Sequence, residues 1–219
     1  MRISPILSVF ALALLVLSVN ASNRGAQEED VFRPIGVTMW VMSKCPDAVS
    51  IENFFAPIFS EFGPKYLSPE LKFIVNDDKG VISSMHGPTE LEGDKYQTCV
   101  QTHVGNTEQF MFALCMDQNY TSIPANVPGC LAYAVPNANS RALVEECVQK
   151  EAITELQLQY GVARLLGVKW SPTIYVDGVR VCLWHEKDRC PIGTTKAEWT
   201  EYICNLIEKK GGELPQPCH

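Results

Sequence analysis

The sequence predicts a mixed α/β domain with a disulfide-stapled, mainly helical insertion in its middle. The first observation is a change of hydrophobic period, from a continuous apolar run over 35–42 to a helical spacing over 51–62. The second is a pair of apolar runs, 174–176 and 179–183, with a polar turn between them. The third is the presence of nine cysteines, a number typical of cross-linked domains in oxidising compartments.

The N-terminus has the pattern of a secretory signal peptide. Residues 1–21 contain a basic start at Arg2, a short apolar stretch and the small-residue spacing Val19-Asn20-Ala21, which predicts cleavage after Ala21. A membrane anchor is the alternative, but the stretch is shorter than the roughly 20 residues that a spanning helix needs. We therefore expect a protein of the secretory pathway, lysosomal or extracellular, without membrane contact once the signal peptide is removed.

The remaining chain is long enough for one domain with its own core. We expect a linker at 22–34, a domain at 35–212, a helical insertion in that domain at about 85–150, and a tail at 213–219 that carries Cys218. The net charge of −7 argues against nucleic acid as a partner. Asn119-Tyr120-Thr121 is a glycosylation sequon with Asn119 as its acceptor, consistent with passage through the secretory pathway.

Cysteines in an oxidising compartment are expected to pair, and their odd number leaves one over. Cys45 is the natural candidate for the free thiol. Short separations predict local bridges between Cys182 and Cys190 and between Cys204 and Cys218. The other four can pair in three ways, which the sequence leaves open: Cys99, Cys115, Cys130 and Cys147. No pair of short cysteine spacings forms a tetrahedral ligand set, so we expect no metal.

Cys45 lies where the expected first strand ends and the first helix begins. Pro46 suits the first position of a helix, and Asp47 falls in its first turn. A thiol at a helix N-terminus faces unpaired N–H groups and the positive end of the helix dipole, which favour the thiolate that attacks disulfides. We interpret Cys45 as a catalytic nucleophile whose surroundings are shaped by Pro46 and Asp47. The alternative interpretation is a buried structural cysteine that only packs.

The C-terminal third supplies a helix, a hairpin and a last helix. A helical pattern covers 154–166, and the turn Asp177-Gly178 joins the two apolar runs into a hairpin. Thr195 and Glu198 form a capping box that opens the final helix. The dipeptide Ser171-Pro172 stands directly before the hairpin.

This order of elements resembles the thioredoxin fold: a strand followed by a cysteine-led helix, a strand at 71–76, a long middle, a helix, the hairpin and a terminal helix. In that family the proline that corresponds to Pro172 follows a cis peptide bond and lies against the active sulfur. The resemblance implies a cis bond between Ser171 and Pro172. It also implies that both residues shape the site around Cys45 and leave backbone groups open to an extended substrate chain.

The middle of the chain narrows the resemblance to one family. Its cysteine series resembles that of the gamma-interferon-inducible lysosomal thiol reductase family over roughly 36–218. The likeness is carried by Cys45-Pro46-Asp47, Met85-His86-Gly87, Phe112-Ala113-Leu114-Cys115-Met116, Cys130-Leu131-Ala132-Tyr133-Ala134, Glu145-Glu146-Cys147 and Ile203-Cys204-Asn205-Leu206, with Cys99 and Cys218.

Departures from the family pattern mark a divergent member. The family's second active cysteine corresponds to Ala48, and the first cysteine of its Cys-Gln-His-Gly motif corresponds to Ser84. The motif's later cysteine has no obvious counterpart at 89–93. Cys182 and Cys190 are gained instead, which keeps the number of framework cysteines even.

Members of that family reduce disulfides of unfolding proteins, and the resemblance implies the same chemistry here with a single thiol. Cys45 would form a mixed disulfide with a disulfide-containing or unfolded protein substrate. An external small thiol such as glutathione or cysteine would then release it, and no other cofactor is expected. The alternative is a non-catalytic thioredoxin-like domain that binds extended or unfolded polypeptides beside Pro172. We expect a monomer, with a covalent dimer through Cys45 as a third possibility.

Overall fold

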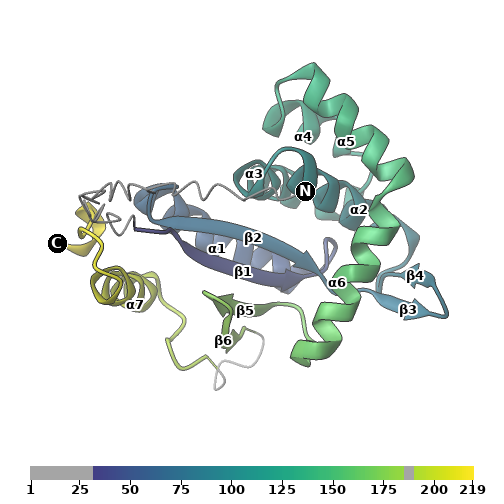
Figure 1. Cartoon of the computed structure of the whole chain (residues 1–219). Coiled ribbons are helices and arrows are strands. Elements are labelled where there is room, and N and C mark those ends of the chain that lie inside the picture. Colours follow the sequence, from purple (N-terminus) through teal and green to yellow (C-terminus); the bar gives the residue numbers. More distant parts are fainter. Residues whose placement is uncertain (1–31, 185–189) are drawn as a thin grey trace, which may run out of the picture. The chain divides into compact units, whose positions relative to one another are not determined.

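The computed structural model describes residues 32–184 and 190–219 (Figure 1). The signal peptide expected at 1–21 and most of the linker expected at 22–34 lie outside the described residues. Within the described ranges, no helix is long and apolar enough to cross a membrane.

The main sheet has four strands in the order β2-β1-β5-β6. The strands are β1 (Ile35–Val41), β2 (Leu67–Phe73), β5 (Thr173–Val176) and β6 (Val179–Leu183). β1 and β2 are parallel, whereas β5 is antiparallel to both β1 and β6. Both residues of the turn Asp177-Gly178 have positive φ, which is the geometry that a tight two-residue hairpin requires.

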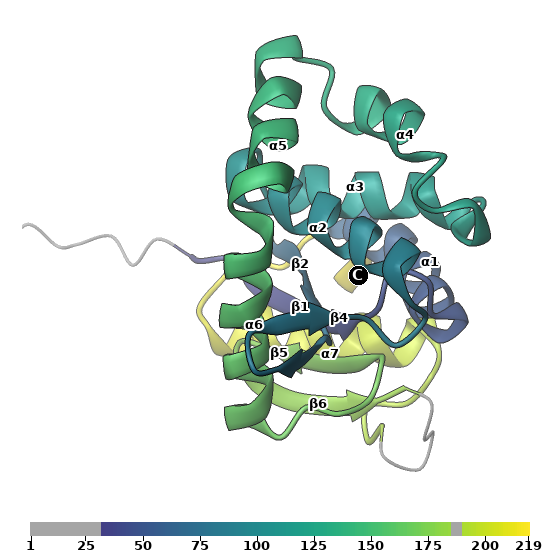
Figure 2. The same cartoon turned by 90° about the vertical axis from the view of Figure 1, so that its right-hand side faces the viewer.

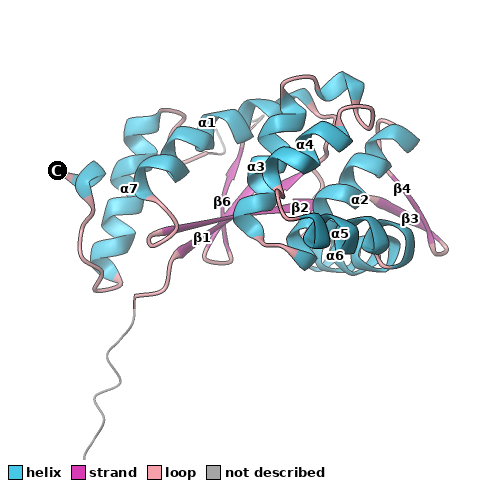
Figure 3. Ribbon diagram, turned by 90° about the horizontal axis from the view of Figure 1, so that it is seen from above, coloured by secondary structure: helices cyan, strands magenta, loops and turns pink. Residues whose placement is uncertain are grey.

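The second strand begins four residues earlier and ends three residues earlier than the sequence pattern predicted. Inward-facing positions alternate from Leu67 to Phe73, and Pro69 is accommodated because β2 is the edge strand of the sheet. Asn76, expected to end this strand, instead begins β3 (Asn76–Asp78), which pairs with β4 (Val81–Ser83) in a separate ribbon. The ribbon projects at one end of the molecule (Figure 3).

Helices cover both faces of the main sheet. One face of the sheet packs on α1 (Pro46–Phe62) and α7 (Lys196–Lys209). In this core the rings of Phe55 and Trp199 pack edge to face, with 4.8 Å between their centroids. On the other face, Trp40 and Tyr175 pack against α6 (Ala152–Leu166). Figure 1 shows α1 behind the sheet and α6 in front of it. The α1 helix continues through Pro57.

Four helices form the insertion: α2 (Pro88–His103), α3 (Asn106–Asp117), α4 (Val127–Ala134) and α5 (Ala138–Lys150). They enclose a second core of their own. The structure selects one of the three pairings that the sequence left open: Cys99–Cys147 joins α2 to α5, and Cys115–Cys130 joins α3 to α4. In Figure 2, α5 and α6 follow one another in a single column beside the sheet.

The insertion and α6 close part of the open edge of the sheet along β2. Gln109 of α3 accepts a hydrogen bond from the backbone N–H of Leu71 and donates one to its carbonyl oxygen, at 2.9 and 3.0 Å. Gln159 of α6 accepts from the backbone N–H of Phe73 at 2.7 Å. Side-chain amides thus pair backbone groups that an edge strand would leave unsatisfied.

Two further disulfides hold the C-terminal part. Cys182 pairs with Cys190, and Cys204 of α7 pairs with Cys218 of the short 3-10 helix Gln216–Cys218. The capping box between Thr195 and Glu198 is formed at the start of α7.

Candidate active site around Cys45

Cys45 is the one free cysteine of the chain, because the other eight form the four disulfides. It is the N-cap residue of α1, with extended backbone angles, and Pro46 follows in the first helical turn. Its carbonyl oxygen accepts the first intrahelical hydrogen bond, from the N–H of Val49 at 3.1 Å. Only 8% of Cys45 is exposed to solvent. Asp47 is exposed in the first turn.

Ser171 and Pro172 lie at the same end of the sheet as Cys45. In the antiparallel pairing of β1 with β5, Trp40 stands opposite Thr173, so the segments that extend beyond these two residues run side by side. The segment beyond β1 leads to Cys45, and the residue before β5 is Pro172, whose peptide bond with Ser171 is cis. The hydroxyl oxygen of Ser171 is buried and has no hydrogen-bond partner among the described residues.

The loop between β1 and Cys45 is bonded to two buried carboxyl groups of α2. The backbone N–H of Ser43 donates to Asp94 Oδ1 at 3.0 Å, and that of Lys44 donates to Glu90 Oε1 at 3.0 Å. Burial, followed by the nearby negative charge of Glu90, raises the pKa of Asp94 to about 7, while hydrogen bonds from Ser43 and Ser84 act in the opposite direction.

A second pair of acids joins α1 to α3. Glu52 is buried in α1, one helical turn beyond Ala48, and shares a hydrogen bond with Asp117 at the end of α3. Burial raises the pKa of Glu52 well above its usual range, and the charges of Asp117 and Cys45 raise it further. Burial also raises the pKa of Asp117 to about 7, while the hydrogen bond with Glu52 acts in the opposite direction.

The sequence analysis missed these four carboxyl groups. It gave no role to Glu52, Glu90, Asp94 or Asp117, since acidic side chains are almost never fully buried unless they are paired. Glu90 and Asp94 are separated by four residues after a Gly-Pro start, and this spacing was the available signal that both lie on one face of a helix. His86, which belongs to the motif Met85-His86-Gly87, bonds through Nδ1 to Glu90 Oε1 at 2.7 Å.

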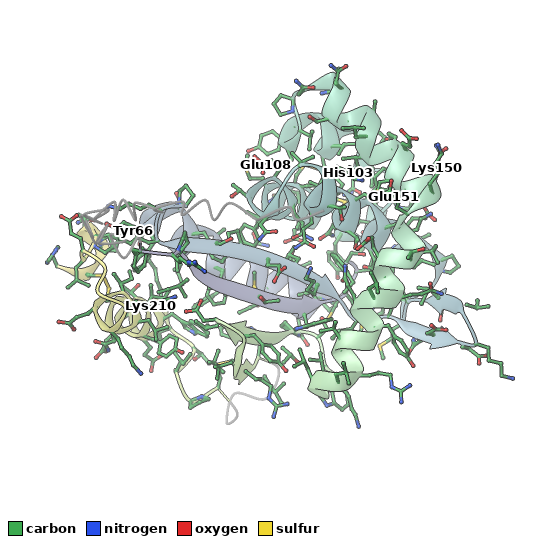
Figure 4. The ribbon with its side chains drawn as sticks, in the orientation of Figure 1. Tyr66, His103, Glu108, Lys150, Glu151 and Lys210 are labelled. Atoms are coloured by element: carbon green, nitrogen blue, oxygen red, sulfur yellow. A yellow bond between two sulfur atoms is a disulfide. The ribbon has the colours of Figure 1, made fainter. Side chains whose placement is uncertain are left out.

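Among the described residues, one group has ligand atoms close enough to suggest a metal: His103, Cys147 and Glu151. Figure 4 labels His103 and Glu151, which lie side by side with 3.1 Å between Nε2 and Oε2. Cys147 is committed to its disulfide with Cys99 and has no thiolate to offer. The group therefore does not fit a metal site.

The predicted glycosylation acceptor, Asn119, is exposed at the turn that follows α3. The hydroxyl group of Thr121 donates to Asn119 Oδ1 at 3.0 Å, so the two functional residues of the sequon contact one another.

The fold and the site together define a thioredoxin-like protein with a single cysteine at the N-terminus of its first helix. Residues 36–134 match the family model described as gamma interferon inducible lysosomal thiol reductase (GILT). The match agrees with the resemblance drawn from the sequence over this part of the chain, and the fold of the described residues is thioredoxin-like. The match extends from β1 to the end of α4, so Pro172 lies outside it.

Solved structures of bacterial disulfide oxidoreductases are similar in fold. BdbD from Bacillus subtilis, in its oxidised form, has 16% sequence identity and a TM-score of 0.53 over 84% of this chain and 89% of that one. Oxidised Mtb DsbA has 14% identity and a TM-score of 0.55 over 84% and 86%. Pseudomonas aeruginosa DsbA2 has 15% identity and a TM-score of 0.51 over 80% and 89%. At these identities the likeness establishes the fold alone. No curated protein sequence matches the chain significantly.

Proposed function

We propose that this protein is a thiol–disulfide oxidoreductase that reduces or isomerises protein disulfides through the single thiolate of Cys45. The observation that carries the proposal is the placement of the one unpaired cysteine at the N-cap of α1, at the end of the sheet where Pro172 precedes β5. The GILT match and the thioredoxin-like fold support thiol–disulfide chemistry in general. The reaction needs no prosthetic group, because sulfur atoms carry the electrons.

The reaction runs in three exchanges. The Cys45 thiolate attacks one sulfur of the substrate disulfide, so that a mixed disulfide forms and the other substrate sulfur leaves as a thiolate and takes up a proton. An external thiolate then attacks the Cys45 sulfur and releases the substrate as its second thiol. A second external thiolate attacks the small-thiol sulfur bound to Cys45, which regenerates the enzyme and leaves a small-thiol disulfide.

Because residue 48 is alanine, release of the mixed disulfide depends on an external thiol. A second cysteine at that position would attack the mixed disulfide from within the molecule, and such intramolecular reactions reach effective molarities on the order of 10⁵–10⁸ M when well oriented. With Ala48 the release step depends on the concentration of the external thiol. Glutathione or cysteine would supply this thiol.

The substrate is a disulfide-containing polypeptide in an extended or unfolded state. Such a chain would approach Cys45 at the end of the sheet where the cis Ser171–Pro172 bond precedes β5. In this proposal the protein loses residues 1–21 as a signal peptide and is glycosylated at Asn119. Its destination is the lysosome or the extracellular space. The four disulfides suit an oxidising compartment.

A second candidate function is a non-catalytic domain that binds unfolded polypeptides. The burial of Cys45 and the methyl group of Ala48 favour it, because both reduce thiol exchange. Reduction of a fluorogenic disulfide-linked protein, with excess small thiol at pH 4.5 and 7, separates the two. Activity above the small-thiol background that disappears in Cys45→Ser supports the oxidoreductase, whereas equal rates for the two proteins leave the binding domain.

A further inference from the structure

The loop that presents Cys45 is fixed by α2 rather than by its own helix. Two consecutive backbone N–H groups of this loop donate hydrogen bonds to carboxylate oxygens: that of Ser43 to Asp94 Oδ1 and that of Lys44 to Glu90 Oε1. The hydroxyl group of Ser43 also donates to the backbone oxygen of Glu90 at 3.0 Å. These contacts cross more than 45 residues of sequence and involve side chains of Glu90 and Asp94 that are fully buried.

Both carboxyl groups also form hydrogen bonds with the segment that precedes α2. Ser84 donates from its hydroxyl group to Asp94 Oδ2 at 2.6 Å. His86 meets Glu90 twice, with its backbone N–H on Oε2 at 2.8 Å and its Nδ1 beside Oε1 at 2.7 Å. Each acid therefore has one oxygen on the loop before Cys45 and further bonds to the segment before α2, which restricts its rotation.

Close packing brings α2 against the loop. A β-carbon added to Gly93 would lie 2.6 Å from Ser43 Oγ and 2.7 Å from Cγ2 of Ile123. Only glycine fits at this position of the helix without displacing Ser43. His86 lies beside Glu90 through Nδ1, whereas the Lys44 ammonium is bonded elsewhere, to Thr89 Oγ1 and two backbone oxygens of the α3–α4 connection.

We propose that Glu90 and Asp94 are positioning residues, which hold Ser43 and Lys44 so that Cys45 stays at the N-cap of α1 in the orientation needed for thiol exchange. This inference rests on the proposed function for its purpose but on the hydrogen bonds above for its geometry. Neither acid touches the reacting sulfur. Loss of the loop bonds frees the turn before Cys45, so that the thiol is held less firmly against the N-terminus of α1.

Two substitutions at one position isolate the hydrogen bond from the charge. Asp94→Ala and Asp94→Asn both remove the carboxylate charge, but the asparagine amide oxygen still accepts from the N–H of Ser43. Glu92→Ala is the matched control, because Glu92 lies on the same helix and its side chain pairs with Lys95 instead of the loop. The readouts are the pH midpoint of Cys45 alkylation by iodoacetamide and the turnover of the fluorogenic substrate.

We expect the alkylation midpoint of Asp94→Ala to lie at higher pH than that of Asp94→Asn, and its turnover to be about tenfold lower or more. Glu92→Ala should match the wild-type protein. Coincident midpoints for the two Asp94 variants would overturn the proposal. A wild-type protein without turnover would instead contradict the proposed function, and the alkylation comparison would still test the positioning role.

A second variant covers the case in which Asp94→Ala does not fold. Gly93→Ala leaves both carboxyl groups in place and displaces Ser43 by its added methyl group. Its control is Gly161→Ala on α6, where an added β-carbon meets nothing within 4 Å. We expect Gly93→Ala to raise the alkylation midpoint relative to Gly161→Ala, and equal midpoints would overturn the proposal.

Discussion

Ala48 follows Cys45 by three residues and is 2% exposed, so its methyl group fills the position from which a second thiol would reach Cys45. Residues three apart at the start of a helix share one face. A cysteine at position 48 would therefore lie on the same face of α1 as Cys45.

Ala48→Cys should convert the protein to a two-cysteine enzyme. We expect an intramolecular disulfide with Cys45 in the oxidised form, and turnover that no longer rises in proportion to the small-thiol concentration, because the new thiol resolves the mixed disulfide. Kinetics over a range of glutathione concentrations check this, with Ala48→Ser as the control of equal size. A variant that keeps the wild-type thiol dependence would show that position 48 cannot reach Cys45.

The buried acids predict that the protein is more stable in acid than at neutral pH. The pKa of Asp94 rises from 3.8 to about 7 on folding, and those of Glu52 and Asp117 also rise. Between pH 3.8 and about 7, Asp94 binds more protons in the folded protein than in the unfolded chain. The free energy of unfolding therefore falls as the pH increases through this range. Each unit of pKa shift contributes about 1.4 kcal/mol to that fall. The contribution is complete below pH 3.8 and is lost above about 7.

Urea denaturation at pH 5 and pH 8 measures this effect. We expect a larger free energy of unfolding at pH 5, and a smaller difference between the two pH values in Asp94→Asn. The lowered pKa values of Glu146 and Glu198 do not interfere, because the stability they contribute is lost only as the pH falls below about 4.5. Greater stability at pH 8 than at pH 5 would contradict the electrostatic account.

Gln109 should be essential to the stability of the sheet edge. Gln109→Leu removes both bonds to Leu71 and leaves a buried N–H and carbonyl oxygen unpaired, which costs about 1–3 kcal/mol for each group. We expect the free energy of unfolding to fall by about 2 kcal/mol or more. Gln118→Leu, at the exposed end of α3, is the comparison and should change it by less than about 0.5 kcal/mol. Equal losses of unfolding free energy in the two variants would show that the backbone groups of Leu71 are hydrogen-bonded in another way.

The sequence allowed prediction of the parts that depend on local pattern. The change of hydrophobic period at Cys45 located the end of β1 and the start of α1, and the turn residues Asp177 and Gly178 located the hairpin. The start of β2 was misplaced because its outward positions are polar and Pro69 interrupts the strand pattern, while burial still alternates from Leu67.

Contacts between distant segments were beyond prediction. The pairing of Cys99 with Cys147 depends on how α2 and α5 pack, which no spacing encodes. The same holds for Asp94, which is polar and appears on a helix with little hydrophobic periodicity, yet is fully buried against Ser43. Its role becomes visible only when the loop before Cys45 is placed against α2.

Glutathionylation tests the central claim most directly. The folded protein, with its four disulfides intact, would be incubated with oxidised glutathione and examined by intact mass spectrometry and peptide mapping. The account predicts one glutathionyl group for each chain, located on Cys45 and released by excess reduced glutathione, with no addition to Cys45→Ser. A wild-type protein that gains no glutathionyl group, or gains it at another cysteine, would contradict the assignment of Cys45 as the exchanging thiol.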